Sequence, residues 1–208
     1  MLQTKLNRYF IFGKRKLMSG LKSLTPSRII GRFTGPKILA NSIPKAGTNL
    51  LDQVLFNMPS IRYSGRRTLR KHTHTKDKIN SIISKSSRGL YYLGHIEYSE
   101  ELSNFLKLNG FKSIIIIRDP RQVIVSHYKY VTSIDSNHTT HKYFQNLKND
   151  SERLNAVIDG VPNIVEPIHE VLKSYEGWLE DSNTLAVRFE DLIGEKGGGS
   201  SEKQIKTI

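Results

Sequence analysis

Apolar runs alternate with amphipathic stretches along most of the chain. Four short runs are typical of strands, at residues 37–42, 90–93, 113–118 and 184–189. The third run contains four consecutive isoleucines with no polar alternation. Such a run is typical of a parallel strand that is covered on both faces. The pattern therefore predicts a parallel sheet with this strand in its interior.

Helical periodicity occupies most segments between these runs. We expect helices at about 48–57, 99–108, 119–131 and 164–180. The stretches 60–88 and 132–162 are polar and weakly periodic. They predict surface loop with a short helix in the first stretch, and short helices around 140–158 in the second. Strands that alternate with helices predict an α/β class, with three layers around a central parallel sheet.

The two ends of the chain have a different character. Residues 1–36 are basic and interrupted by glycine and proline, which predicts a loosely structured N-terminal arm with one short helix. Residues 37–208 then form a single domain. Three glycines at 197–199 break the chain before a final helix, inside which the sequence stops at Ile208.

The net charge of +13 is concentrated in the first half of the 208 residues. The segment from Met1 to Leu51 has ten Lys or Arg and no acidic residue, and residues 62–88 have nine against a single Asp77. Such a field attracts nucleic acid, an anionic membrane surface, an acidic polysaccharide or a multiply charged nucleotide. A solvated basic surface explains most of these charges equally well, so charge alone does not identify the partner.

Two further observations narrow the classes of protein. The apolar patch 9–12 is too short to cross a membrane, but with the basic run 14–16 it could lie on an anionic membrane surface. The chain has no cysteine, which excludes disulfides, thiol catalysis and thiolate metal sites. We expect a reducing compartment, the cytoplasm, and no metal site.

The first chemical motif is a strand, a loop and a helix over residues 39–51. The loop reads Pro44-Lys45-Ala46-Gly47-Thr48-Asn49. A glycine turn that opens a helix behind a buried strand gathers unpaired N–H groups, which with the helix dipole make an anion site. Lys45 adds a charge, and Thr48 and Asn49 add hydrogen-bonding side chains. The loop is not a Walker A loop, because its lysine precedes Gly47. A plain connecting turn is the alternative.

The second motif begins with Arg118-Asp119-Pro120 and ends at Ser126. Arg118 lies at the carboxyl end of a predicted strand, where ligands bind in open α/β sheets. Ser126 lies two helical turns later, so a phosphate could bridge the guanidinium group and the hydroxyl. The alternatives are a salt bridge from Arg118 to Asp119 or another surface carboxylate, and a packing role for Ser126.

Together the two motifs resemble those of sulfotransferases that use 3′-phosphoadenosine-5′-phosphosulfate (PAPS). The first is similar to the family's PKSGTT-like 5′-phosphosulfate loop, and the second to its RxPxxxxxS segment for the 3′-phosphate. They lie about seventy residues apart in the same order, and Phe189-Glu190-Asp191-Leu192 is similar to the family's YEDL. The resemblance implies a P-loop NTPase-like sulfotransferase fold.

The resemblance also implies roles for individual residues in binding the donor. Lys45 would contact the bridging oxygen and neutralise the leaving 5′-phosphate, which makes it catalytic as well as nucleotide-binding. The loop residues Ala46, Gly47, Thr48 and Asn49 would hold the 5′-phosphate. Arg118 and Ser126 would hold the 3′-phosphate, and Phe189 would lie near the adenine.

A base for the acceptor hydroxyl is implied at His95. Gly94-His95-Ile96 resembles the family's motif in which a histidine after a strand deprotonates the acceptor. A neutral imidazole suits this role near pH 7. The alternatives are a structural or surface role for His95, with Glu97 as a second choice of base.

The expected reaction moves a sulfuryl group from PAPS to an acceptor hydroxyl by in-line attack. The stretches 60–88 and 132–162 would wall the acceptor pocket, and their basic, polar character favours a carbohydrate over a flat steroid. We expect no nucleic acid partner, because the chain lacks interleaved aromatics on a strand platform.

Four departures from the family pattern keep other functions open. Asn49 replaces a frequent threonine, Leu50 replaces a tryptophan that stacks on adenine, and Leu93 replaces a lysine. The family's RKGxxGxWK-like segment has no counterpart before Ile208, so we expect a C-terminally incomplete domain. The alternatives are an inactive or truncated fragment that binds nucleotide weakly, and a basic polyanion-binding protein. A P-loop kinase would need residues that are missing.

Overall fold

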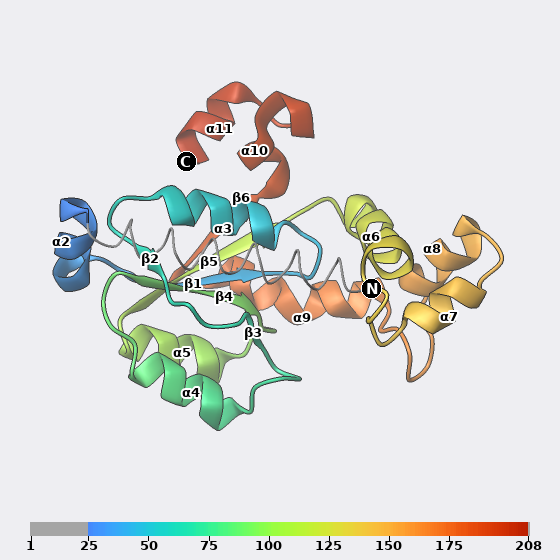
Figure 1. Ribbon diagram of the computed structural model, residues 1–208, viewed down its shortest axis with the longest axis horizontal. Coiled ribbons are helices and arrows are strands. Elements are labelled where there is room, and N and C mark those ends of the chain that lie inside the picture. Colours follow the sequence, from blue (N-terminus) through green and yellow to red (C-terminus); the bar gives the residue numbers. More distant parts are fainter. Residues whose placement is uncertain (1–24, 208) are drawn as a thin grey trace.

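The computed structural model describes residues 25–207 and has a parallel sheet at its centre (Figure 1). The strands lie in the order β2-β4-β1-β5-β6, and β3 pairs with β4 beyond the end of β2. Each of these ladders is parallel. The strands are β1 (Lys37–Ser42), β2 (Arg62–Tyr63), β3 (Leu69–Arg70), β4 (Leu90–His95), β5 (Phe111–Ile117) and β6 (Thr184–Arg188). The expected membrane contact of residues 9–12 lies outside the described residues.

Helices cover both faces of the sheet. On one face lie α3 (Thr48–Asn57) and α10 (Phe189–Ile193), and on the other α4 (Lys76–Ser84), α5 (Glu100–Leu108) and α9 (Ile168–Glu180). Successive strand residues supply the two cores. In β1, Leu39 packs with α4, α5 and α9, whereas Ile38 and Ala40 pack with α3. The three-layer α/β prediction is confirmed.

The run of isoleucines in β5 is buried from both sides, as its lack of alternation predicts. Ile115 and Ile116 have no exposed surface although they face opposite layers. β5 lies between β1 and β6. Together with β1 and β4 it forms the interior of the sheet, and the loops after these three strands carry the candidate site.

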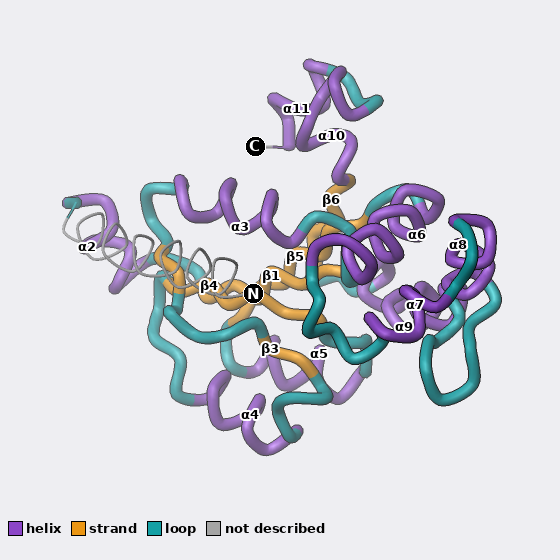
Figure 2. The backbone as a smooth tube through the Cα atoms, turned by 45° about the vertical axis from the view of Figure 1, so that its right-hand side comes forward, coloured by secondary structure: helices purple, strands orange, loops and turns teal. Residues whose placement is uncertain are grey.

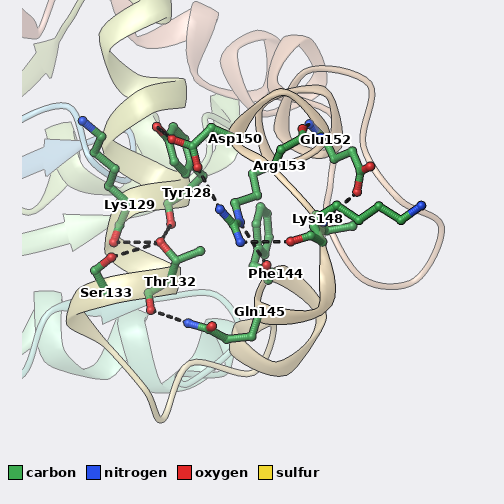
Figure 3. A network of polar contacts seen from close by, with 12 residues as sticks. Tyr128, Lys129, Thr132, Ser133, Phe144, Gln145, Lys148, Asp150, Glu152 and Arg153 are labelled. Atoms are coloured by element: carbon green, nitrogen blue, oxygen red, sulfur yellow. Dashed lines mark hydrogen bonds and ion pairs between the residues drawn. The ribbon is translucent and has the colours of Figure 1, made fainter.

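A separate helical lobe lies beside the carboxyl ends of the strands (Figure 2). It consists of α6 (Pro120–Lys129), a π-helix (Tyr130–Ile134), α7 (His141–Asn146) and α8 (Asp150–Ile158), with its own core around Val131 and Phe144. Figure 3 shows the polar contacts that join these helices. Arg153 donates to the carbonyl groups of Phe144 and Leu147 and pairs with Asp150, which also accepts from the Tyr128 hydroxyl.

Several sequence-based boundaries were wrong. The helix expected from residue 164 begins at Ile168, because Val161 and Val165 close a turn and Pro167 precedes the helix. The stretch 60–88 contains β2 and β3 as well as α4, and Leu69 of β3 is fully buried. Neither strand shows in the sequence, since each has two residues. β4 extends two residues further than expected and ends at His95.

The ends of the described chain also form helices. α2 (Pro26–Thr34) lies in the segment expected as an arm, and it packs on the domain through the Arg28 guanidinium group, which donates to the carbonyls of Phe56 and Met58. After β6, α10 leads into a 3₁₀ turn (Gly194–Gly197) and α11 (Ser201–Thr207). Between residues 25 and 207, no helix combines the length and the apolar character needed to cross a membrane.

Candidate active site

The candidate site lies where β4, β1 and β5 end. These neighbouring strands are parallel, so His95, the loop after Ser42 and Arg118 reach the same edge of the sheet. They line one cavity of about 550 Å³. Its wall also contains the other predicted residues Lys45, Gly47, Thr48, Asn49, Ser126 and Phe189. The two motifs therefore meet around a single space.

The loop after β1 has the backbone of an anion site. Lys45 has a φ of 71° and Gly47 a φ of 120°, and the first bonded amide of α3 is that of Leu50, which donates to the Gly47 carbonyl. The amides of Gly47, Thr48 and Asn49 precede it, and no capping side chain accepts from them within the described chain, because the N-cap is Gly47. These three N–H groups are left for a ligand at the positive end of the helix dipole.

Ala46 differs from the other residues of this loop. Its N–H donates to the Ile43 carbonyl at 3.0 Å, and its side chain has no exposed surface. Ala46 therefore fastens the loop to the core, and we do not count it among the groups that face the cavity.

Gly47 is also the point where the loop contacts Phe189. A Cβ atom on Gly47 would lie 2.5 Å from Cδ2 of the Phe189 ring and 3.0 Å from the Ile116 side chain. Only glycine fits both this contact and the positive φ. The ring at the start of α10 thus lies directly against the loop.

The Lys45 ammonium group is held by an aromatic and acidic pair from the helical lobe. Its Nζ lies 3.4 Å from the centre of the Tyr130 ring, and the Tyr130 hydroxyl donates to Asp135 at 2.8 Å. Burial lowers the pKa of Lys45 to about 8; the Asp135 charge opposes this shift, and Arg118 adds to it. Lys45 is therefore a desolvated cation that can respond strongly to an anion.

His95 is held in one tautomer. Its Nδ1 lies 2.9 Å from the Ser42 carbonyl oxygen, which can only accept, so Nδ1 carries the hydrogen and Nε2 keeps its lone pair. Burial lowers the pKa of His95 to about 4, so the ring is neutral at pH 7. The buried Asn41 side chain bonds both the N–H and the carbonyl of Ile96, which fixes the end of β4 beside the histidine.

One hydroxyl chain joins His95 to the phosphate loop. Ser42 Oγ lies 3.1 Å from His95 Nδ1 and 2.6 Å from Thr48 Oγ1. The candidate base and the start of α3 are therefore positioned by the same residue.

Arg118 keeps most of its hydrogen-bonding capacity. Its Nε donates to Gln122 at 3.0 Å, and Nη1 reaches the Lys45 carbonyl at 3.4 Å. The expected alternative, a salt bridge with Asp119, is absent among the described residues, because Asp119 caps α6 and pairs with Arg121. The guanidinium carbon lies 4.0 Å from the centre of the Phe189 ring.

Comparison with known proteins assigns the chain to a family. The family model described as "Sulfotransferase domain" matches residues 35–199. The chain belongs to the sulfotransferase domain family. A comparison with curated protein sequences finds no significant match.

One solved structure shows the same fold, and a second match is weaker. A mouse sulfotransferase, SULT7A1, in complex with PAP is 23% identical, with a TM-score of 0.52 over 83% of this chain and 56% of that protein. A retinol dehydratase in complex with androsterone and the inactive cofactor PAP is 14% identical, with a TM-score of 0.48 over 82% of this chain and 62% of that one. The sulfotransferase chain thus spans just over half the length of the mouse protein.

Several residues of this sulfotransferase cavity were missed by sequence reasoning. They are Arg70, His72, His127, Tyr130, Asp135 and His138. Tyr130 lies four residues after Ser126, one helical turn, which is a signal that could have found it. Asp135 follows the π-helix and has no such signal.

Burial also lowers the pKa of His127 to about 4, and repulsion from His138 and Lys45 adds to the shift.

The second choice of base lies outside this cavity. Glu97 pairs with Lys71 at 2.7 Å on the surface of the sulfotransferase domain. Two of the departures, Leu50 and Leu93, do line the cavity. The wall is therefore aliphatic where the family pattern has tryptophan and lysine.

Proposed function

We propose that the protein transfers a sulfuryl group from PAPS to an acceptor hydroxyl. The observation that carries this proposal is one cavity that holds two cationic anchors, Lys45 and Arg118, and a neutral His95 with a free Nε2. A nucleotide with phosphates at both its 5′ and 3′ positions requires two such anchors in a shared space.

The residues present fit the donor. The amides of Gly47, Thr48 and Asn49 with Lys45 would hold the 5′-phosphate. Of the five guanidinium N–H groups of Arg118, two have acceptors among residues 25–207, and the other three would be available to the 3′-phosphate beside Ser126. Phe189, between Gly47 and Arg118, would lie near the adenine. When bound, PAPS supplies an activated sulfuryl group on its 5′-phosphate.

His95 would act as the general base. Nε2 accepts the acceptor's hydroxyl proton while Nδ1–H keeps its bond to the Ser42 carbonyl, which stabilises the imidazolium that forms. The acceptor oxygen bonds to sulfur, and the electron pair of the broken S–O bond stays on the 5′-phosphate. Lys45 would neutralise the charge that develops there.

The acceptor would approach from the side of the helical lobe. There the cavity wall contains Arg70, His72, Asp135 and His138, which supports the proposal of a hydroxyl-rich carbohydrate. A second cavity of about 390 Å³ shares Pro44 and adds an aliphatic wall. An acceptor panel should therefore contain both sugars and phenols. The cytoplasmic location stays a prediction, since it rests on the missing cysteines.

Thermal unfolding with PAP, the desulfated form of PAPS, tests the donor site. We expect PAP to stabilise the protein by about 2.7 kcal/mol at a hundredfold excess over its dissociation constant. ADP and ATP should stabilise it much less, because they lack the 3′-phosphate. Arg118→Ala should remove the preference, whereas Arg121→Ala, a nearby exposed arginine, should keep it. Equal shifts from all three nucleotides would favour the polyanion-binding alternative.

Transfer of labelled sulfate from PAPS tests the base. His95→Ala should abolish transfer to any acceptor in the panel and leave PAP binding nearly unchanged. Sulfate transfer by this variant would mean that another residue is the base. PAP binding by the unmodified protein without transfer to any acceptor would favour the inactive, nucleotide-binding alternative.

A further inference from the structure

Helix α2 exposes its apolar face and buries its polar one. Ile29, Ile30 and Phe33 lie on one side of the helix and are 43%, 59% and 74% exposed. The opposite side, with Arg28 and Gly31, is buried against the domain. An amphipathic surface helix normally has the reverse orientation.

Specific contacts hold α2 in this orientation. The Arg28 guanidinium group donates to the carbonyls of Phe56 and Met58 at the end of α3. Gly31 lies so close to Ser60 that a Cβ atom would come within 2.1 Å of the Ser60 carbonyl oxygen. A side chain larger than glycine would not fit, so the apolar side is the side left to face outward.

Positive charge lies beside this apolar face. Asp52 is the only acidic residue among the first 76, and it is buried with its carboxylate bonded to the Tyr91 hydroxyl. Arg32 is exposed on α2. Arg62 lies near it: burial lowers the pKa of Arg62, and the positive charges of Arg32 and Arg28 lower it further. The exposed Arg88 precedes Gly89, whose N–H donates to the Gly35 carbonyl after the helix.

We propose that α2 docks this end of the molecule on an anionic lipid bilayer. Ile29, Ile30 and Phe33 would enter the interface between headgroups and acyl chains, and Arg32 and Arg88 would contact the anionic headgroups. A second copy of the chain fits this surface less well, because a symmetric contact would bring the exposed arginines Arg32 and Arg88 of two copies to the same interface.

The fold then determines where the cavity lies relative to a bilayer bound at α2. α2 precedes β1, so it lies at the amino ends of the parallel strands (Figure 1). The cavity with Lys45 and His95 lies at their carboxyl ends. A strand of six residues separates the two ends by about 20 Å. A bilayer bound at α2 would leave the cavity open to water, so donor and acceptor would reach it from the aqueous side.

Vesicle co-sedimentation of the full chain tests the proposal. We expect binding to phosphatidylcholine vesicles that contain phosphatidylserine, weak binding to phosphatidylcholine alone, and release by added salt. The double variant Ile30→Ser/Phe33→Ser should reduce the partition coefficient about tenfold or more. Leu185→Ser, a matched control on exposed β6, should bind like the unmodified protein. PAP binding and thermal unfolding should be unchanged in both variants.

A probe on α2 locates the contact directly. The chain has no cysteine, so Phe33→Cys offers one position for an environment-sensitive dye. The dye should become shielded from water only when anionic vesicles are added. Three results would overturn the proposal: anionic binding that survives the double variant, a dye already shielded without vesicles, or a dimer that the double variant converts to a monomer.

Discussion

At the scale of single residues, two half-buried histidines link stability to pH. Burial lowers the pKa values of His95 and His127 to about 4, whereas both would be near 6.5 in the unfolded chain. Between these values the unfolded state binds protons that the folded state does not, so stability falls as the pH decreases from about 6.5 toward 4. Each histidine contributes a slope of about 1.4 kcal/mol per pH unit.

Denaturant unfolding at pH 5–6, between the folded and unfolded pKa values, measures this slope. His127→Gln should reduce it by about 1.4 kcal/mol per pH unit, because one proton fewer is taken up on unfolding. A slope that is unaffected by His127→Gln would mean that this histidine is not held neutral in the folded protein.

Gly47 gives a second prediction at this scale. Gly47→Ala should weaken PAP binding and destabilise the fold, because the new methyl group meets the Phe189 ring in addition to straining the backbone. Gly65→Ala is the matched control, since Gly65 also has a positive φ of 73° but nothing within 4 Å of its Cβ position. Backbone strain alone should cost about 1–2 kcal/mol at Gly65. If denaturant unfolding showed that both variants lose the same free energy of unfolding, the contact with the Phe189 ring would not contribute to the effect at Gly47.

Sequence patterns found the residues of this site that lie in contiguous motifs. Lys45, Gly47 and Arg118 belong to loops that follow buried strands, so their placement depends on local structure that the pattern already predicts. Tyr130 and Asp135 could not be assigned a role in the same way. The contact of Tyr130 with Lys45, and the charge that Asp135 places near it, depend on the π-helix and on how the helical lobe packs against the sheet.

At the scale of elements, long apolar runs were predictable and short strands were not. The isoleucines of β5 show burial on both faces directly. β2 and β3 have two residues each and form because β4 offers an open edge, which is a tertiary effect. The orientation of α2 is equally invisible in the sequence, since it depends on the carbonyls that Arg28 finds at the end of α3.

Glu190 connects two elements of the site and can be tested as a positioning residue. Its buried carboxylate accepts the Asp119 N–H at 2.9 Å, so α10 holds the turn that presents Arg118. Glu190→Ala should destabilise the protein by about 1–3 kcal/mol and weaken PAP binding. Glu190→Gln keeps an acceptor and should restore most of both, as seen in denaturant unfolding and calorimetry. If Glu190→Ala left the PAP affinity unchanged, α10 would not position the nucleotide-binding residues.

At the scale of the whole molecule, the parallel sheet separates two surfaces. The cavity lies at the carboxyl ends of the strands, and the basic, apolar surface of α2 lies at their amino ends. The sequence predicts the first arrangement, because parallel strands bring their loops to one edge. The second requires the structure, because the same residues could also belong to a helix that packs its apolar side inward.

Calorimetric titration with PAP and with 5′-AMP tests the central claim most directly, because the two ligands differ only in the 3′-phosphate. The unmodified protein should bind PAP at least tenfold more tightly than 5′-AMP, as expected for an added charge-assisted contact. Arg118→Ala should bring the two affinities together, whereas Lys45→Ala should weaken both and keep their ratio. Equal affinities of the unmodified protein for the two nucleotides would contradict a cavity built to hold a nucleotide at both of its phosphates.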